Sequence, residues 1–194
     1  MANLSTTYDD ILRCARSLIV AGGYNGFSYA DIAKVVGIRN ASIHHHFPAK
    51  ADLVHTLVTR YREEVAVGLA ELTLHVPDPA GQIQAYMSYW QDCITTGSAP
   101  ICVCALLSSQ MQMLPTEVAA EVRAHFQTLS DWLTGVLSRG AEQGTVVLTD
   151  SAEAEAALLL ATIHGAMLSA RAHGDAGIFG VIARPALRRL FIQH

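Results

Sequence analysis

The sequence lacks an apolar run long enough to cross a membrane. A membrane-spanning helix needs about 18 or more consecutive apolar residues. The longest candidate, residues 156–167, is interrupted by Thr162 and His164. Residues 1–10 are polar and acidic, and they have neither the basic flank nor the apolar stretch of a secretory signal. We therefore expect a cytoplasmic protein that makes no contact with the membrane.

Cysteine is scarce, and its spacing fits neither a disulfide framework nor a zinc site. The four cysteines are Cys14, Cys93, Cys102 and Cys104, and no two of them form a CxxC pair. A chain of 194 residues can bury a core of its own without covalent cross-links. We expect four reduced thiols, no metal and no cofactor.

Motifs that carry catalysis are missing as well. The sequence has no glycine-rich phosphate loop, no GxSxG nucleophile and no pair of carboxylates in an apolar setting. Glu63 and Glu64 fit the solvated face of a helix. A helical enzyme is therefore the weakest hypothesis, and we predict no catalytic residue.

Charged residues make up only 15% of the chain and hydrophobic residues 51%, a composition typical of a folded protein. The formal net charge of −4 is unevenly distributed. Residues 1–60 contain six basic and four acidic side chains, whereas the rest of the chain contains seven basic and thirteen acidic ones. Because such asymmetry is typical of chains with one part that faces nucleic acid, the first 60 residues are the place to look for a DNA-binding element.

Apolar residues recur with the helical period of about 3.6 along almost the whole chain, and the only short strand candidate is residues 145–148. We predict an all-α fold with an N-terminal domain of residues 1–48 and a C-terminal domain of residues 49–194. The predicted helices are residues 8–21, 28–36, 39–46, 50–74, 80–97, 101–113, 116–139, 151–173 and 176–192.

Two of the short helices have the form of a helix-turn-helix. Ser28 begins the first as an N-cap with Asp31 in the capping-box position, and Gly37 lies in the tight turn that follows. Ile43 and Phe47 are four residues apart, so they share the face that anchors the second helix. The opposite face is polar and suits contact with a DNA backbone and with base edges. Its residues are Arg39, Asn40, Ser42, His44 and His45.

Three adjacent histidines, His44, His45 and His46, invite comparison with a metal site. Consecutive side chains on a helix point about 100° apart, so the three cannot converge on one ion. We therefore predict that His46 packs within the domain and that no metal binds there.

Residues 28–54, SYADIAKVVGIRNASIHHHFPAKADLV, resemble the DNA-binding signature of the TetR family of transcriptional regulators. The matching positions are Ile32, Ala33, Gly37, Ala41, Ser42, Ile43, His46, Phe47, Lys50 and Leu53. One position departs from the pattern, because His44 stands where the family usually has a tyrosine that touches a phosphate. The resemblance implies a three-helix helix-turn-helix domain followed by a helical domain for ligand binding and dimerisation.

The resemblance also implies roles for individual residues. Arg39 and Asn40 would reach base edges in the major groove, where arginine pairs with guanine and asparagine with adenine. An imidazole at position 44 can still donate to a phosphate, in a manner that depends on pH. His45 would face the DNA. Contacts with the phosphate backbone are implied for Ser28, Tyr29, Ser42, His44 and Lys50.

The implied ligand pocket has apolar and aromatic side chains available to line it, although the same residues fit an ordinary core equally well. Cys102 allows a further alternative, in which the protein senses oxidants or electrophiles. No basic residue lies near Cys102 in the sequence to activate its thiol. The candidate ligand contacts are Tyr86, Trp90, Cys102, Met111, Phe126 and His164.

Small residues give the predicted helix 151–173 a close-packing face, which with helix 176–192 would form the four-helix interface of a two-fold homodimer. A buried core helix is the alternative. The sequence therefore predicts a dimeric repressor that binds a near-palindromic double-stranded operator and is released by a small apolar or amphipathic effector. The alternatives are redox sensing through Cys102 and a ligand-binding module with weak affinity for DNA.

Overall fold

The computed structural model describes residues 7–191, and within this range it contains helices and loops but no strand. The all-α fold class is thus confirmed. No helix among these residues has both the length and the apolar composition that a membrane span requires. The helices are α1 (Thr7–Gly22), α2 (Tyr29–Val36), α3 (Asn40–His46), α4 (Lys50–His75), α5 (Pro79–Thr96), α6 (Val103–Ser108), the short 3₁₀ helix η1 (Met111–Met113), α7 (Thr116–Glu142), α8 (Ala152–His173) and α9 (Gly177–Leu190).

The described residues form two compact units. The first unit contains residues 7–63 and 103–125, and the second contains residues 64–102 and 126–191. Helices α4 and α7 each begin in the first unit and end in the second. The predicted domain boundary at residue 48 falls just before α4 and stays a prediction. Residues 1–6 and 192–194, which the predicted domains and the last predicted helix include, lie outside the described residues.

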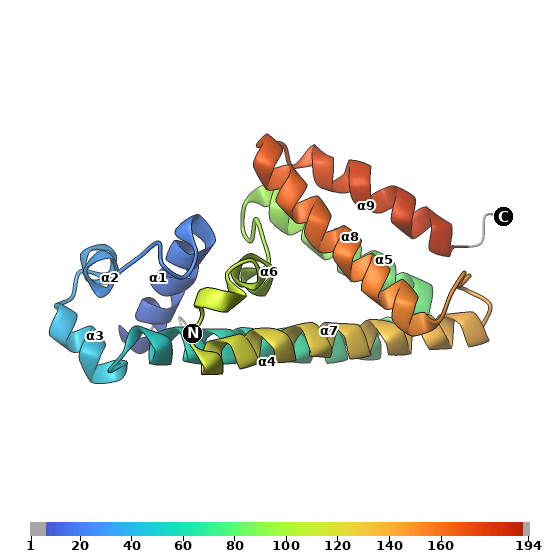
Figure 1. The fold of residues 1–194 in the computed structure, drawn as a ribbon. Helices are drawn as coiled ribbons and strands as arrows, with labels where there is room; N and C mark the ends of the chain where they lie inside the picture. Colours follow the sequence, from blue (N-terminus) through green and yellow to red (C-terminus); the bar gives the residue numbers. More distant parts are fainter. Residues whose placement is uncertain (1–6, 192–194) are drawn as a thin grey trace. The chain divides into compact units, whose positions relative to one another are not determined.

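The first unit is built around α1. This helix packs against α2 and α6, and α2 packs against α3 (Figure 1). Its core contains isoleucine and leucine side chains that are completely removed from solvent, and each such burial stabilises the fold by about 1.5–3 kcal/mol. They are Ile11, Ile19, Ile32, Ile43 and Leu53.

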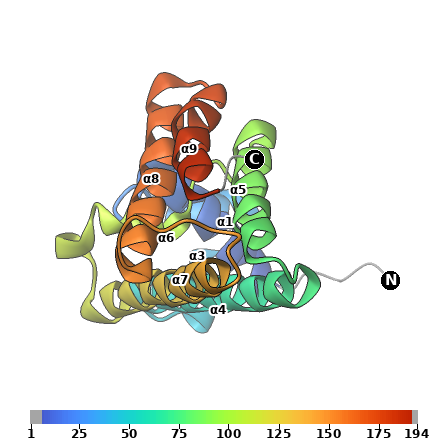
Figure 2. The ribbon, with the colours of Figure 1, turned by 90° about the vertical axis from the view of Figure 1, so that its right-hand side faces the viewer.

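The second unit is centred on α9, which packs against both α8 and α5 (Figure 2). Helices α8 and α9 run antiparallel (Figure 1). The Ser151 hydroxyl accepts a hydrogen bond from the Ala154 N–H and caps α8. The core between the helices contains Ile83, Leu133, Ile163 and Phe179.

The predicted helix 101–113 is wrong in its extent. Helix α6 covers only Val103–Ser108, and a separate 3₁₀ turn follows at Met111–Met113. The hydroxyls of Ser108 and Ser109 donate to the carbonyls of Ala105 and Leu106, which gives the backbone an alternative to helical hydrogen bonds. The short strand candidate at 145–148 is also wrong, because this segment is a loop in which two N–H groups donate to the Gly140 carbonyl.

Candidate functional site

Local contacts fix both ends of α2. The Asp31 carboxylate accepts hydrogen bonds from the hydroxyl and the backbone N–H of Ser28, each at 2.7 Å, and these bonds hold the pKa of Asp31 below its usual value. At the other end, Gly37 has a φ of 77° and its N–H donates to the Ala33 carbonyl. Glycine adopts this left-handed conformation readily because it has no Cβ. The predicted capping box and glycine turn are confirmed.

Helix α3 is anchored by its inner face. Ile43 is fully buried and Phe47 is 2% exposed. The Phe47 ring stacks on Tyr8 of α1 at a centroid distance of 4.9 Å, and the exposed His46 ring lies edge-on to the same tyrosine at 5.8 Å. Among residues 7–191, no three His, Cys, Asp or Glu side chains gather as they would around a metal ion.

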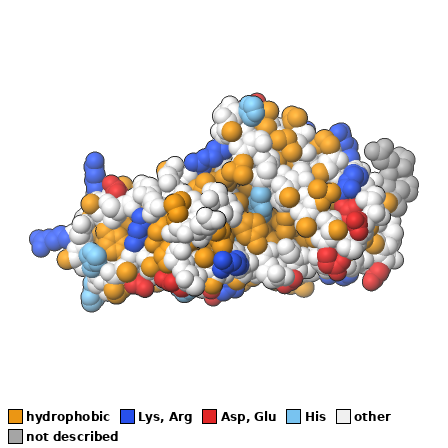
Figure 3. Space-filling view, viewed as in Figure 1, with side chains coloured by type: hydrophobic (Ala, Val, Ile, Leu, Met, Phe, Trp, Pro, Cys, Tyr) orange, Lys and Arg blue, Asp and Glu red, His pale blue; other side chains and the backbone are white. Residues whose placement is uncertain are grey.

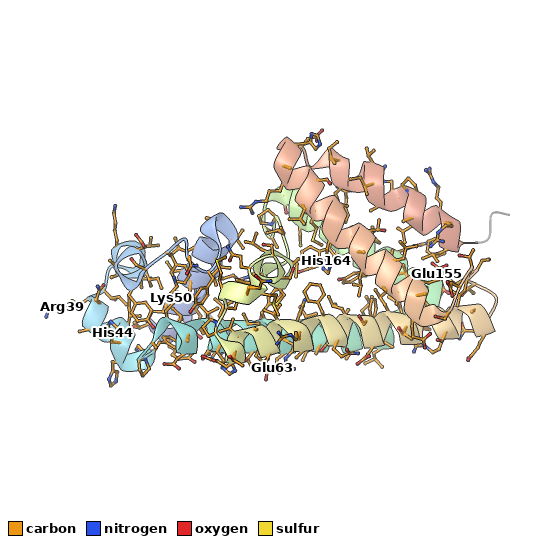
Figure 4. All side chains as sticks on the ribbon, viewed as in Figure 1. Arg39, His44, Lys50, Glu63, Glu155 and His164 are labelled. Carbon is orange, nitrogen blue, oxygen red and sulfur yellow. The ribbon has the colours of Figure 1, made fainter. Side chains whose placement is uncertain are left out.

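The outer face of α3 is polar and open. Arg39, Asn40, His44 and His45 are exposed, and Ser42 is half-buried. Figure 4 shows Arg39 and His44 projecting from the end of the unit that carries α3. Lys, Arg and His side chains gather over the same end (Figure 3). The structure therefore brings the predicted DNA contacts of α3 onto one accessible surface.

Tyr29 and His44 form a pair that bridges α2 and the end of α3. The Tyr29 hydroxyl donates to the Phe47 carbonyl at 2.9 Å, and burial raises the pKa of Tyr29 to about 12. The His44 ring lies 4.7 Å from the Tyr29 ring, with Nδ1 at 3.2 Å from the Pro48 carbonyl. Because a carbonyl only accepts, Nδ1 carries a hydrogen, and Nε2 of a neutral His44 can only accept. Only a protonated His44 can donate to a phosphate.

Lys50 holds the loop before α2 against the start of α4. Its ammonium donates to the Phe27 carbonyl and lies 4.0 Å from the centre of the Phe27 ring and 5.0 Å from that of Tyr24. Burial lowers the pKa of Lys50, and the nearby Asp31 carboxylate opposes this shift. The side chain thus stabilises the unit from within, and its contact with a phosphate stays a prediction.

Four of the predicted phosphate contacts therefore have partners inside the first unit, namely Ser28, Tyr29, His44 and Lys50. Ser28 shows its partner in the sequence, because Asp31 follows at capping-box spacing. The partners of Tyr29 and Lys50 lie 18 and 23 residues away along the chain, so no local sequence pattern predicts these contacts. The same holds for Gln110, whose side-chain oxygen accepts from the Tyr24 N–H and secures the turn after α1.

The predicted ligand contacts fall into two groups. Tyr86, Trp90, Cys102, Phe126 and His164 belong to the second unit, whereas Met111 belongs to the first. Within the second unit, the Phe126 and His164 rings meet edge-on at a centroid distance of 5.2 Å.

The Tyr86 ring lies 5.3 Å from Trp132, a contact that joins α5 to α7. Aromatic side chains from three helices thus line the inside of the second unit.

Comparison with known proteins agrees with this architecture. The profile of the bacterial regulatory proteins of the tetR family matches residues 11–57, which contain α2 and α3. The sequence matches no curated protein.

Several solved structures share the fold along almost the whole chain. A TetR-family transcriptional regulator from Agrobacterium tumefaciens is 60% identical, with a TM-score of 0.93 over 95% of this chain and 97% of the other. A TetR regulator from Legionella pneumophila is 26% identical, with a TM-score of 0.85 over 97% and 99%. FadR from Bacillus subtilis, solved with stearoyl-CoA, is 15% identical and has a TM-score of 0.75 over 94% and 96%. The chain belongs to the TetR family of transcriptional regulators, which bind DNA through their helix-turn-helix.

Proposed function

We propose that the protein is a homodimeric repressor that binds a near-palindromic operator through α3 and leaves it when a small apolar or amphipathic effector binds the second unit. The observation that carries this proposal is the exposed group Arg39, Asn40 and His45 on a helix whose inner face is locked into the core. A rigid helix with polar outward side chains can read base edges, and each good pairing discriminates between bases by about 1–3 kcal/mol.

The dimer is supported by an apolar stripe on α8. Leu158 and Leu168 are 49% and 46% exposed, and a Cβ added to Gly165 would meet open space. Hydrophobic side chains are visible over this part of the surface (Figure 3). A helix that is apolar on every side needs a cover on its outer face as well as its inner one. The exposed residues of the stripe are Ala154, Ala157, Leu158, Ala161, Gly165 and Leu168.

A two-fold dimer would present two copies of α3 to successive major grooves about 34 Å apart. An effector that binds one conformation of the protein better than another shifts the population toward that conformation. If the favoured conformation has a different spacing of the two α3 helices, the effector weakens operator binding. The loss in operator binding free energy then equals the loss that bound operator causes in effector binding.

Selection of genomic DNA fragments on the purified protein tests the DNA-reading part. We expect an enriched palindrome and a loss of roughly ten- to hundredfold in operator affinity for Arg39→Ala, the effect of one lost base contact. Arg123→Ala is the matched control, since Arg123 is an exposed arginine of α7 in the same unit. The proposal is wrong if no palindrome is enriched, or if Arg39→Ala binds as tightly as the control.

The redox alternative gains no support from the geometry. Cys102 and Cys104 are both completely buried, whereas reactive thiols are accessible and lie in electropositive surroundings. If Cys102→Ser responds to effectors as the wild type does, thiol chemistry is not the signal.

A further inference from the structure

The inside of the second unit contains polar atoms that its own residues leave unsatisfied. Among the described residues of this unit, the buried side-chain atoms without a hydrogen-bond partner are the Tyr86 hydroxyl, the Trp90 N–H and His164 Nε2. The three side chains are 6%, 5% and 9% exposed. Each buried polar atom left unpaired costs about 1–3 kcal/mol. Each such atom in a native structure therefore requires an explanation, and a bound molecule that supplies the missing partner is one explanation.

The other buried polar groups of the same unit are satisfied. Gln82 donates to the Val76 carbonyl at 2.7 Å and accepts from Arg139 at 3.3 Å. The indole N–H of Trp132 can be compared with that of Trp90, because it donates to the Thr73 hydroxyl at 3.0 Å. Of the two tryptophans in the chain, one is therefore paired and the other, Trp90, is not.

The unsatisfied atoms Tyr86 Oη and Trp90 Nε1 lie near one another. Tyr86 and Trp90 are four residues apart on α5 and so share one face of the helix. Burial raises the pKa of Tyr86, and the nearby indole N–H of Trp90 opposes part of that rise. The phenol thus keeps its hydrogen at neutral pH. Because an indole N–H can only donate, this pair offers donors to whatever lies beside it.

The charges of the unit define the ligand further. No Lys or Arg side chain among the described residues is buried. Arg189 and Arg139, which reach buried groups of the unit, are already engaged with Glu155 and Gln82, so neither is a free counter-charge for an anion. The buried carboxylate of the unit, Glu155, is already paired with Arg189. A cation would thus lack a free counter-charge too, and an unpaired buried charge is far more costly than an unpaired dipole.

We propose that the second unit binds an uncharged apolar molecule whose carbonyl oxygen accepts hydrogen bonds from Tyr86 and Trp90. His164, which points from α8 into the unit (Figure 4), contacts a second polar atom or the apolar body of the same molecule. This inference rests on the proposed effector function and adds the chemical class of the effector and the atoms that select it.

Isothermal titration calorimetry with a matched set of nine-carbon probes tests the ligand class. The probes are 2-nonanone, nonane, sodium nonanoate and nonylammonium chloride, each titrated into the full-length protein. We expect 2-nonanone to bind at least tenfold more tightly than each of the other three. Tighter binding of the carboxylate or the amine, equal binding of the hydrocarbon, or binding of no probe would overturn the proposal.

Variants test the atoms. Tyr86→Phe and Trp90→Phe should each weaken 2-nonanone binding about two- to tenfold, the value of one net hydrogen bond. Tyr89→Phe on the same helix is the matched control, because the Tyr89 side chain is 56% exposed and the change keeps its ring. Unchanged binding in both Tyr86→Phe and Trp90→Phe would contradict the assigned donors.

Operator binding is measured in parallel, so that the two proposals can fail separately. If the protein binds 2-nonanone but no operator, the ligand site is supported and the repressor function is contradicted. If the protein binds an operator but none of the probes, the repressor function is supported and the ligand site is contradicted.

Discussion

At the scale of single residues, His44 gives this protein a chemistry that a tyrosine at the same position would not. Its Nδ1 is committed to the Pro48 carbonyl at 3.2 Å, and its ring rests against Tyr29. The remaining nitrogen can donate to a phosphate only in the charged form of the ring, because Nδ1 holds the hydrogen of the neutral ring. A contact between His44 and the operator backbone would therefore be a hydrogen bond between two charged groups.

We predict that His44→Ala weakens operator binding roughly tenfold at constant pH and salt, the value of a hydrogen bond between charged groups. His44→Tyr should restore most of the lost affinity, because a phenol can also donate to a phosphate. Fluorescence anisotropy with labelled operator measures these affinities. His173→Ala, a change at an exposed histidine at the end of α8, should bind the operator as the wild type does. Wild-type affinity in His44→Ala would show that His44 does not touch the backbone.

At the scale of helices, Glu155 ties the start of α8 to the end of α9. Its carboxylate is 2% exposed, accepts from the Thr149 hydroxyl at 2.6 Å and pairs with Arg189 of α9. The bond from Thr149 is the main reason that the pKa of Glu155 lies below its usual value, and the bond and charge of Arg189 add to it. The stabilisation is fully present above the pKa of the unfolded chain and disappears as pH falls through the folded-state pKa.

Glu155→Gln should therefore lower the free energy of unfolding at pH 7 by about 1–3 kcal/mol. The difference from the wild type should shrink toward zero in acid, once the native carboxylate is also uncharged. Urea unfolding at a series of pH values measures both effects. Glu153→Gln, an exposed neighbour in the same first turn, should change little at any pH. A pH-independent loss in Glu155→Gln would show that packing, rather than charge, explains the role of the residue.

Helices and caps could be predicted from the sequence because their signals are local. The capping box of Ser28 and Asp31 and the turn at Gly37 each lie within four residues of the helix that they define. No local pattern shows that Gln110, which follows α6, accepts a hydrogen bond from the Tyr24 N–H at a distance of 86 residues along the chain. The internal partner of Lys50 was missed for the same reason.

The predicted ligand contacts show a different limit. Composition could suggest that Tyr86 and Trp90 lie inside the fold, but whether their polar atoms have partners depends on the packing of several helices. Trp90 and Trp132 look alike in the sequence, and only the tertiary arrangement gives one of them a partner. Sequence patterns therefore predict which side chains are buried better than they predict which of them remain available to a ligand.

At the scale of the whole molecule, the division of charge and the apolar stripe of α8 indicate different functions for the N-terminal and C-terminal parts of the chain, namely DNA binding and subunit contact. The first 60 residues are basic overall, which suits DNA, and the remainder is acidic. The stripe carries small and apolar side chains exposed to solvent, with Ala161 and Gly165 near its middle. Its small side chains allow two helices to approach closely across a two-fold axis.

We predict that Ala161→Glu prevents the proposed dimer from forming, because the two-fold axis would bring two like charges together in an apolar interface. Operator affinity should fall by about a hundredfold or more, since each monomer then binds one half-site without the help of the other. Light scattering coupled to gel filtration measures the mass, and anisotropy measures the affinity. Leu74→Glu, at a residue 76% exposed near the end of α4, should remain a dimer with unchanged affinity. A dimeric Ala161→Glu that binds the operator normally would place the subunit contact elsewhere, and the exposed stripe would then require another explanation.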